Sequence, residues 1–346
     1  MFLSFRFIFR IAKFLVILFL FMVVYQSDLK ADIPITEKGF NDTLLDEGIE
    51  LPAWFKLSFL DIKEDIEEAK QAGKKGLVLY FGMSKCPYCK ALIENNFGKN
   101  DIARYTQQNF DVVAIDVKGN RNVTTASGEV MSEKEFAIRS QANFTPTLIF
   151  YNHSGKEVHR LVGYYAVYRF RAALEYVADE HYKNEIFKSY LARGDMPEKE
   201  NMGEINYRSF SMTKPYILGR KTIRSQRPLL VIFEQNNCHA CNVLHADVLD
   251  RKEITNVFPD LDVVQLDVSD SSVLVTPDEK KISVEKWAQN LNIFYTPTLL
   301  FYDERGDEIL RLGSVSHFNR LNNVVKYIST KAYKHYNNYA EWKHKQ

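Results

Sequence analysis

The chain contains four cysteines, and all four lie in two C-x-x-C pairs. Cys86 and Cys89 occur in MSKCPYCKALIENNF (83–97), and Cys238 and Cys241 occur in QNNCHACNVLHADVL (235–249). A pair at this spacing closes almost no loop, so it gains little of the stabilisation that long-loop disulfides provide. Thiolates at this spacing exchange disulfides or bind a metal ion. Redox-active pairs, one shared metal site and structural staples are therefore all open interpretations at this point.

Each pair follows an apolar run and opens a predicted helix. The first cysteine of each pair would then lie beside unpaired backbone N–H groups and the positive end of the helix dipole, which both favour thiolate. Pro87 suits the first turn of a helix, and Lys85 adds positive charge nearby. His239 would stabilise the thiolate of the second pair when it is protonated. Cys89 and Cys241 lie one turn further in, where each is suited to resolve a mixed disulfide.

The cysteine motifs belong to an internal repeat. GLVLYFGMSKCPYCKALIENNF (76–97) aligns with PLLVIFEQNNCHACNVLHADVL (228–249), and FTPTLIFYNHSGKEVHRL (144–161) aligns with YTPTLLFYDERGDEILRL (295–312). The offset stays at about 151 residues throughout. We therefore predict two homologous domains, at 32–195 and 210–346, joined by a polar linker at 196–209 that contains Pro197 and Gly203.

Each repeat alternates helical and strand patterns. The first repeat predicts helices at 61–72, 132–141 and 165–183, strands at 77–81 and 111–117, and a hairpin of 147–152 with 157–163. Polar loops are expected at 118–131 and, in the second repeat, at 269–282. This order predicts an α/β fold in which a mixed central sheet is flanked by helices.

Residues 1–31 are predicted to be a signal peptide or an N-terminal anchor. MFLSFRFIFRIAK carries three basic residues and no acid, and it precedes the apolar run FLVILFLFMVV (14–24). This pattern is typical of a secretory signal, here with cleavage after Ala31, while the stretch counted from Phe7 also fits an uncleaved anchor. Both alternatives predict an exported, periplasmic protein that contacts the inner membrane only if the segment is uncleaved.

The bulk composition narrows the function further. The net charge of +1 argues against a general nucleic-acid binder, which shows a strong basic excess. The separation of the two pairs, about 150 residues, argues against one Cys₄ zinc site. The histidines other than His239 show no ligand spacing with one another, and we interpret them as surface or hairpin residues: His153, His159, His181, His245, His317, His335 and His344.

Together these motifs resemble the thioredoxin fold, in which a strand, a C-x-x-C pair opening a helix and a T-P-T before a hairpin recur. The resemblance implies that Pro146 and Pro297 are cis and that Thr145 and Thr296 bind the substrate backbone opposite the cysteines. It covers nearly all of the chain after the N-terminal segment, twice. It is closest to exported thioredoxin-like proteins, including the SoxW-like type.

The residues around the cysteines resemble several branches of this family. Threonine before the proline resembles DsbC-like isomerases. The pair Pro87–Tyr88 between the first two cysteines resembles glutaredoxins, so Tyr88 is expected to help tune that site. Thioredoxins carry a buried acid six residues before the first cysteine, where this chain has Tyr80 and Ile232. Neither residue can relay a proton from the second cysteine as a carboxylate would.

We predict an extracytoplasmic thiol–disulfide oxidoreductase, most simply a reductase of protein or peptide disulfides. Cys86 and Cys238 would attack, and Cys89 and Cys241 would resolve. No bound organic cofactor and no metal ion are expected, because the disulfides Cys86–Cys89 and Cys238–Cys241 would carry the electrons. The resemblance implies a membrane thiol carrier as the reductant. The alternative is a client-binding or copper-handling module without turnover, since thiolates suit Cu(I).

Overall fold

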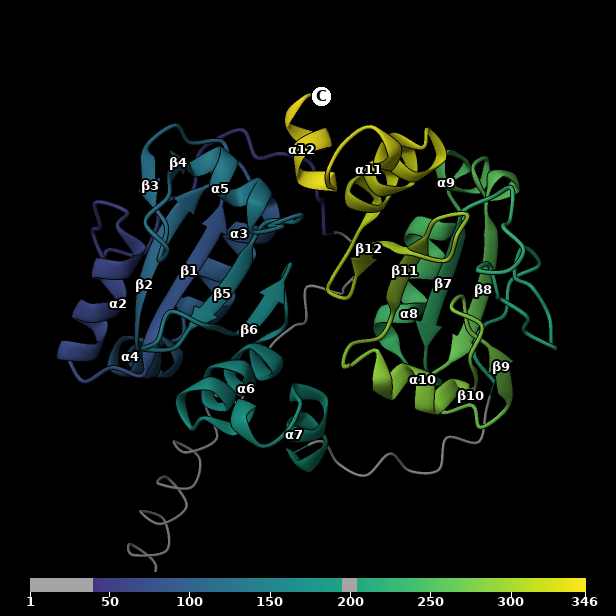
Figure 1. Ribbon diagram of the computed structural model, residues 1–346, viewed down its shortest axis with the longest axis horizontal. Coiled ribbons are helices and arrows are strands. Elements are labelled where there is room, and N and C mark those ends of the chain that lie inside the picture. Colours follow the sequence, from purple (N-terminus) through teal and green to yellow (C-terminus); the bar gives the residue numbers. More distant parts are fainter. Residues whose placement is uncertain (1–39, 195–203) are drawn as a thin grey trace, which may run out of the picture. The chain divides into compact units, whose positions relative to one another are not determined.

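The computed structural model describes residues 40–194 and 204–346. The predicted N-terminal segment, 1–31, lies outside these residues. We call 40–194 domain 1 and 204–346 domain 2, and each contains a four-stranded sheet with helices around it (Figure 1). Both domains belong to one compact unit of the chain. The two sheets confirm the predicted α/β fold with a mixed sheet in each repeat.

Domain 1 has the strand order β2-β1-β5-β6, in which β1 is parallel to β2 and antiparallel to β5, and β5 is antiparallel to β6. Its elements are, in chain order, α2 (Ile62–Gln71), β1 (Gly76–Gly82), α3 (Pro87–Ala91), η1 (Leu92–Phe97), α4 (Asn100–Asn109), β2 (Phe110–Asp116), β3 (Asn122–Thr124), β4 (Val130–Ser132), α5 (Glu133–Arg139), β5 (Thr147–Tyr151), β6 (Glu157–Val162), α6 (Val167–Ala178), η2 (His181–Lys183) and α7 (Phe187–Gly194).

Domain 2 repeats this order as β12-β11-β7-β8, with β7 parallel to β8 and antiparallel to β11. Its elements are β7 (Leu229–Glu234), α8 (His239–Val243), η3 (Leu244–Leu249), α9 (Lys252–Thr255), η4 (Phe258–Asp260), β8 (Asp262–Asp267), β9 (Val273–Val275), β10 (Lys281–Ser283), α10 (Val284–Asn290), β11 (Thr298–Tyr302), β12 (Glu308–Leu312), α11 (Phe318–Ser329), η5 (Ala332–Lys334) and α12 (Tyr339–His344). Residues 204–209, which the sequence places in the linker, include the buried Ile205.

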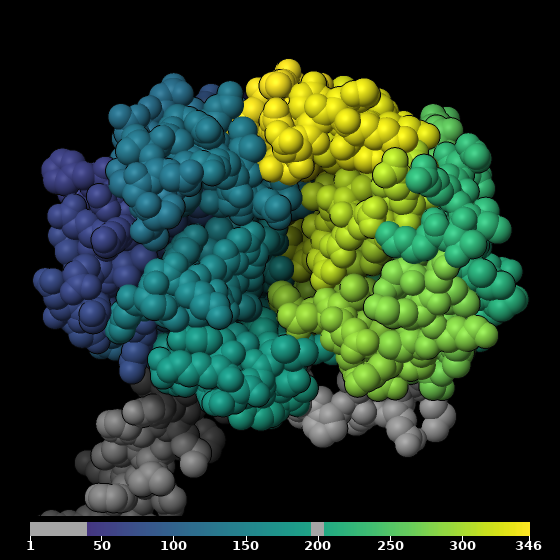
Figure 2. Space-filling view, viewed as in Figure 1, coloured from purple at the N-terminus to yellow at the C-terminus, as the bar shows by residue number. Residues whose placement is uncertain are grey.

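The interior strands β1 and β7 are buried on both faces, as their unbroken apolar runs predict. Leu77 and Leu79 of β1 pack with α2 and α5 on one face, while Val78 and Tyr80 pack with η1 and α6 on the other. Strand residues alternate between faces, so one apolar strand supplies both halves of the core. Side chains fill the space between the ribbons on the face seen in Figure 2.

Polar side chains mark the starts of two predicted helices. The Asp61 carboxylate accepts hydrogen bonds from the backbone N–H groups of Lys63 and Glu64 at the start of α2. The Ser132 hydroxyl oxygen accepts from the Glu135 N–H at the start of α5, as the capping pattern predicts. A buried helix end without such partners would leave N–H groups unsatisfied. These caps therefore fix where both helices begin.

The prediction of polar loops at 118–131 and 269–282 was wrong in part. In domain 1 the segment contains β3, which pairs with β4 as a short antiparallel hairpin, and β9 and β10 do the same in domain 2. The interior residue of each first strand, Val123 or Leu274, is buried in the core. These single apolar residues anchor otherwise polar segments, and strands of three residues are too short to show alternation.

Both cysteine-bearing helices change their hydrogen-bond pattern after one turn. The α-helical residues 87–91 and 239–243 continue as six-residue π-helical segments, η1 and η3. In domain 1 the π segment buries Asn96, whose amide nitrogen donates to the Tyr165 carbonyl at 3.0 Å. Such segments occur mostly inside α-helices and often at functional sites. Here each one follows directly on the C-x-x-C turn.

Candidate active sites

The sheet register brings each cysteine pair to a T-P-T loop. Phe81 near the end of β1 pairs with Thr147 at the start of β5, and the strands are antiparallel. The residues after β1 and those before β5 therefore meet at one edge of the sheet. In domain 2 the equivalent pair is Phe233 and Thr298. The peptide bonds Thr145–Pro146 and Thr296–Pro297 are both cis.

Cys86 caps the helix that it opens. Its sulfur accepts a hydrogen bond from the Cys89 backbone N–H at 3.0 Å and another from the Thr145 hydroxyl at 3.2 Å. Its thiol also lies 3.6 Å from the Thr145 carbonyl oxygen. Pro87 occupies the first helical position, as predicted. Two donors thus face the Cys86 sulfur, an arrangement that suits a thiolate.

The two thiols of domain 1 differ in acidity. Burial opposes ionisation of Cys86, but hydrogen bonds from Cys89 and Thr145 and the positive charge of Arg320 together lower its pKa to about 7. Burial, together with the hydrogen bond and negative charge of Cys86, raises the pKa of Cys89 well above its usual value. Cys86 is therefore the thiolate of this pair near neutral pH, and Cys89 keeps its proton.

Tyr80 adjoins both thiols. Its hydroxyl is buried, and it interacts with the sulfur of Cys89 and, more weakly, with that of Cys86. Burial, followed by the effect of Cys89, raises the pKa of Tyr80 well above its usual value. The phenol therefore keeps its proton at physiological pH.

The cation at Cys86 comes from far along the chain. The predicted Lys85 side chain is exposed, and the charge that most lowers the Cys86 pKa is that of Arg320 in α11. Arg320 donates from Nη2 to the Thr145 carbonyl at 2.8 Å, and its guanidinium carbon lies 3.5 Å from the Tyr88 ring centroid. The sequence gives no sign of this contact, because about 230 residues separate Arg320 from Cys86.

Tyr88 anchors this contact. Its hydroxyl donates to the Asp42 carboxylate at 3.0 Å and accepts from the His317 backbone N–H at 2.9 Å. Asp42 also accepts from the backbone N–H groups of Asn319 and Arg320. Tyr88 and Asp42 thus hold the start of α11, with Arg320, beside the first cysteine pair. The pocket beside Cys86, with a volume of about 510 Å³, is lined by Tyr88, Thr145 and Arg320 among others.

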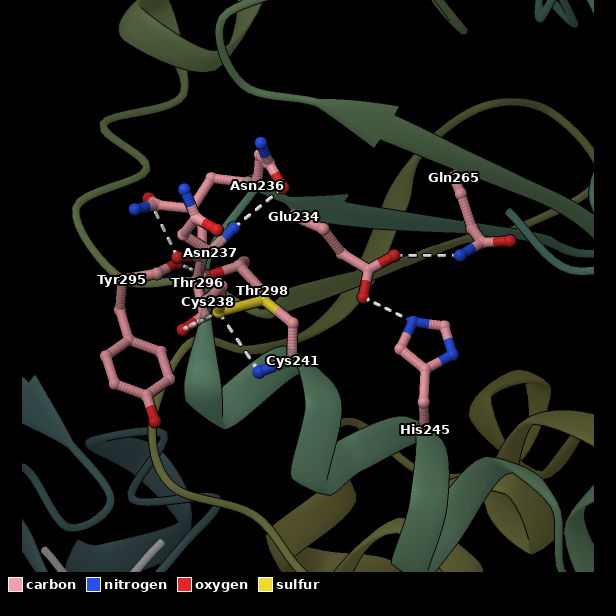
Figure 3. Close-up of a disulfide and its surroundings, with 11 residues drawn as sticks. Glu234, Asn236, Asn237, Cys238, Cys241, His245, Gln265, Tyr295, Thr296 and Thr298 are labelled. Atoms are coloured by element: carbon pink, nitrogen blue, oxygen red, sulfur yellow. Dashed lines mark hydrogen bonds and ion pairs between the residues drawn. A yellow bond between two sulfur atoms is a disulfide. The ribbon is translucent and has the colours of Figure 1, made fainter. Parts of the chain in front are cut away.

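In domain 2 the cysteines are joined as a disulfide, whereas those of domain 1 are free thiols. Cys238 caps α8, and its sulfur lies 3.0 Å from the Cys241 backbone nitrogen and 3.6 Å from the Thr296 carbonyl oxygen (Figure 3). The Thr296 hydroxyl donates to the Gln235 side chain at 3.0 Å, not to sulfur. The predicted tuning residue His239 is exposed at the first helical position.

The surroundings of the second pair contain residues that the sequence interpretation missed. His245 is buried rather than on the surface, and its Nε2 lies 2.7 Å from the buried carboxylate of Glu234. Ile232 stands where thioredoxins carry a buried acid, but this domain has the carboxylate of Glu234 two residues later in β7. The signal was visible, since Glu234 is the charged end of the apolar run LLVIFE. His317 is buried as well, so the surface interpretation was wrong for it too.

Over 40–194 and 204–346, no helix is long and apolar enough to cross a membrane. Within the same ranges, no group of three or more histidine, cysteine, aspartate or glutamate side chains is placed to hold a metal ion.

Comparisons with known proteins agree with this architecture. Residues 62–178 and 220–329 each match the family model of a thioredoxin-like domain. Among curated protein sequences, none is similar enough to this chain to count as a relative.

Solved structures match one repeat's length of the chain. A thioredoxin-fold protein from Helicobacter pylori is 23% identical over 35% of this chain and 84% of its own, with a TM-score of 0.31. A thioredoxin from Thermus thermophilus is 24% identical over 34% of this chain and 83% of its own, with a TM-score of 0.28. A DsbH oxidoreductase is 16% identical over 38% of this chain and 91% of its own, with a TM-score of 0.28. Because the family model matches more than half of the chain, in two places, the chain belongs to the thioredoxin-like domain family and carries two copies of that domain.

Proposed function

We propose that the protein is a thiol–disulfide oxidoreductase that reduces disulfides of proteins or peptides outside the cytoplasm. The observation that carries this proposal is the Cys86 sulfur, which accepts two hydrogen bonds and has a pKa lowered to about 7 beside a protonated Cys89. A nucleophilic thiolate next to a resolving thiol is the arrangement that disulfide exchange requires. The same pair of residues recurs in domain 2.

The reaction at each site has two steps. The first cysteine, Cys86 or Cys238, attacks one sulfur of the substrate disulfide and releases the other as a thiolate. The second cysteine, Cys89 or Cys241, then loses its proton and attacks the mixed disulfide, which releases the second substrate thiolate. Two protons reach the products, the substrate gains two electrons and the cysteine pair becomes a disulfide. No organic cofactor takes part.

Substrate docking is assigned to the loops Thr145–Pro146 and Thr296–Pro297. Their position beside the first cysteines supports this assignment, since Cys86 and Cys238 each lie 3.6 Å from the threonine carbonyl. A SoxW-like exported reductase of this kind would be kept reduced by a membrane thiol carrier. The basic and apolar N-terminal segment supports the extracytoplasmic location, as a cleaved signal or as an anchor.

The test measures each site separately. The double variants Cys86→Ser/Cys89→Ser and Cys238→Ser/Cys241→Ser leave one pair each, and their reduction potentials are measured in glutathione or dithiothreitol buffers. Potentials near or below that of thioredoxin, about −270 mV, support the reductase, while values near about −120 mV would assign disulfide formation instead. Turnover of a protein disulfide should vanish when both first cysteines become serine. Client affinity that survives this change without any turnover would favour a binding module.

A further inference from the structure

The Cys86 thiol lies at a pocket that residues of both domains line. Cys86 is 1% exposed, and the pocket beside it has a volume of about 510 Å³. Domain 1 contributes residues such as Val117 and Thr145, and α11 and α12 of domain 2 contribute residues such as Asn319 and Tyr339. Sites for small molecules have volumes of about 300–1,000 Å³, so a pocket of this size suits a small disulfide.

Specific contacts hold α12 against domain 1. The Ala340 backbone N–H donates a hydrogen bond to the Asn143 side-chain oxygen at 3.1 Å. The rings of Phe144 and Tyr339 lie 5.1 Å apart between centroids, and Phe144 is buried in an apolar cluster that otherwise consists of domain 2 residues. The C-terminal helix therefore forms a fixed wall of the pocket beside Cys86.

Three cationic side chains line this pocket. Lys118 follows β2, Arg320 belongs to α11 and Lys343 belongs to α12. None of the three forms an ion pair with another residue of 40–194 or 204–346. Arg320 instead donates to the Val315 and Thr145 carbonyls, at 3.2 and 2.8 Å. The pocket therefore carries positive charge that no ion pair cancels.

One carboxylate, that of Asp42, occurs among the described residues that line the pocket. It accepts hydrogen bonds from the Tyr88 hydroxyl at 3.0 Å and from the backbone N–H groups of Asn319 and Arg320 at 3.0 and 2.9 Å. This carboxylate is thus engaged at the start of α11. Three cations against one anion leave a formal excess of two positive charges around the pocket.

The basic groups of α12 repel their neighbours. Desolvation, followed by the positive charges of Lys118 and Lys326, lowers the pKa of Lys343. Desolvation, followed by the positive charges of nearby lysines, also lowers the pKa of His344, which lines the same pocket. His344 therefore adds hydrogen-bonding capacity but little charge at neutral pH. A carboxylate bound in the pocket would offset the repulsion among the lysines.

The pocket beside the second cysteine pair has the opposite character. It has a volume of about 180 Å³, and Cys238 and Cys241 both line it. Two glutamates, Glu204 and Glu234, lie among the described residues around it, and no lysine or arginine does. The two sites of one chain therefore differ in the sign of the charge that surrounds them.

The aligned residues explain part of this difference. Ser269 is aligned with Lys118, and Ala192 is aligned with Lys343, so neither lysine has a cationic counterpart. The third cation of the pocket has an arginine counterpart, Arg169, but this residue does not line the pocket of the second pair. The cationic pocket is thus a property of the first site.

We infer that α11 and α12 of domain 2 complete the active site of domain 1 as a cationic pocket, which binds disulfides that carry carboxylate groups. The inference rests on the proposed function and names the substrate class of its first site. Lys118, Arg320 and Lys343 attract the anionic substrate and orient it beside the Cys86 sulfur. The chemical steps are the exchange given above, so the pocket supplies binding and adds no reactant. The carboxylates belong to a small molecule or to a short acidic peptide, and the experiment separates these sources.

The first measurement compares iodoacetate with iodoacetamide, two reagents of nearly equal size that differ by one negative charge. The full chain is used in its reduced form, with Cys238→Ser/Cys241→Ser to isolate the first site and Cys86→Ser/Cys89→Ser to isolate the second. Both reagents attack the same thiolate, so the ratio of their rates does not depend on the thiolate population. The ratio should be about tenfold higher or more at the first site in low salt, and the difference should shrink at about 1 M salt.

Lys118→Gln/Lys343→Gln is the decisive variant, because both lysines are exposed and the fold does not depend on their charges. The iodoacetate-to-iodoacetamide ratio of the first site should fall about fivefold or more. Lys63→Gln/Lys70→Gln is the matched control, since it removes the same net charge from α2, which does not line the pocket. Its ratio should stay within about twofold of the parent. An equal fall in both variants, or an unchanged ratio in the first, would overturn the inference.

Exchange is then measured with two pairs of disulfides. An aromatic disulfide with a carboxylate on each ring is compared with an uncharged pyridyl disulfide. An oxidised peptide with glutamates beside its cystine is compared with the same peptide carrying glutamines. The charged member should react faster relative to its uncharged partner in the parent than in Lys118→Gln/Lys343→Gln. Such a preference in one pair identifies that source of carboxylates, and a preference in both pairs includes both; each result supports the inference.

The failure of the pocket and the failure of the proposed function give different results. If the lysine variant changes neither pair of disulfides, the inference is overturned, even where exchange is fast. If the first site shows the expected alkylation ratio but reduces none of the four disulfides, the cationic pocket stands and the proposed function fails for domain 1.

Discussion

The Thr145 hydroxyl should set much of the acidity of Cys86. Its hydrogen bond to the sulfur, at 3.2 Å, is stronger when the sulfur is a thiolate. A hydrogen bond to a charged group contributes about 1.5–3 kcal/mol, and one pKa unit corresponds to about 1.4 kcal/mol. Replacing threonine by valine keeps the shape and removes the donor. Thr145→Val should therefore raise the pKa of Cys86 from about 7 by roughly one to two units.

The assay is the rate of iodoacetamide alkylation against pH in the reduced Cys238→Ser/Cys241→Ser protein. Only the thiolate reacts, and burial keeps Cys89 protonated, so the midpoint of the profile reports Cys86. Thr145→Ser retains a hydroxyl and should keep the parental midpoint. The second repeat offers a matched control.

In domain 2 the equivalent hydroxyl, that of Thr296, donates to Gln235 and not to sulfur. Thr296→Val, made in the reduced Cys86→Ser/Cys89→Ser protein, should therefore leave the alkylation midpoint of the second site unchanged. The reasoning is refuted if Thr145→Val keeps the parental midpoint. It is also refuted if both valine variants shift their sites equally, because the contacts of the two threonines differ.

Three other predictions concern the same domain. Arg320→Gln should raise the pKa of Cys86 by about one unit. The Thr145 carbonyl oxygen lies 2.8 Å from Arg320 Nη2 and 3.6 Å from the Cys86 sulfur, so the positive charge is at most about 6.4 Å from the sulfur. Alkylation profiles would detect the change. Gly82→Ala should lower the free energy of unfolding by about 1–3 kcal/mol, because the new methyl group would lie 2.5 Å from the Tyr80 ring. Gly48→Ala is the control: its methyl group would lie no closer than 3.7 Å to any other atom, so this variant should be neutral. Urea denaturation measures both variants. Because the pKa of Cys86 is lowered in the folded protein, the unfolded chain binds more protons than the folded one between about pH 7 and 9. The free energy of unfolding of the reduced domain should therefore rise with pH in this range, by up to about 1.4 kcal/mol per pH unit, and fall as the pH drops through 7. Cys86→Ser should abolish this slope.

Local patterns carried the prediction of the fold and the placement of the cysteines. Apolar runs, a proline at the first helical turn and the T-P-T before a hairpin are short-range features, and the family resemblance that they support implied that the T-P-T loop lies opposite the cysteines. In the structure, the antiparallel pairing of β1 with β5 brings Cys86 to Thr145. The hairpins β3–β4 and β9–β10 were missed because each depends on one buried residue in a polar segment.

The electrostatic environment of the cysteines was harder to predict, for two different reasons. Arg320 reaches Cys86 through tertiary packing of α11 against Tyr88, and no sequence pattern reports such a contact. Glu234 was within reach, since a single charge at the end of an apolar strand needs a partner when buried. The sequence analysis considered only the position six residues before the first cysteine, where thioredoxins carry a buried acid, and this chain has Ile232 there. Strand periodicity shows that position 234 serves the same face.

The π-helical segments allow the history of this chain to be ordered. Residues 92–97 and 244–249 occupy equivalent places in the two copies, so the simplest ancestry puts this turn in the single domain that was duplicated. The contact between Glu234 and His245 occurs in one copy, and the aligned residues of the other copy, Gly82 and Ile93, share none of its chemistry. The two copies therefore share the geometry of the cysteine-bearing helix and differ in the polar surroundings of the second cysteine.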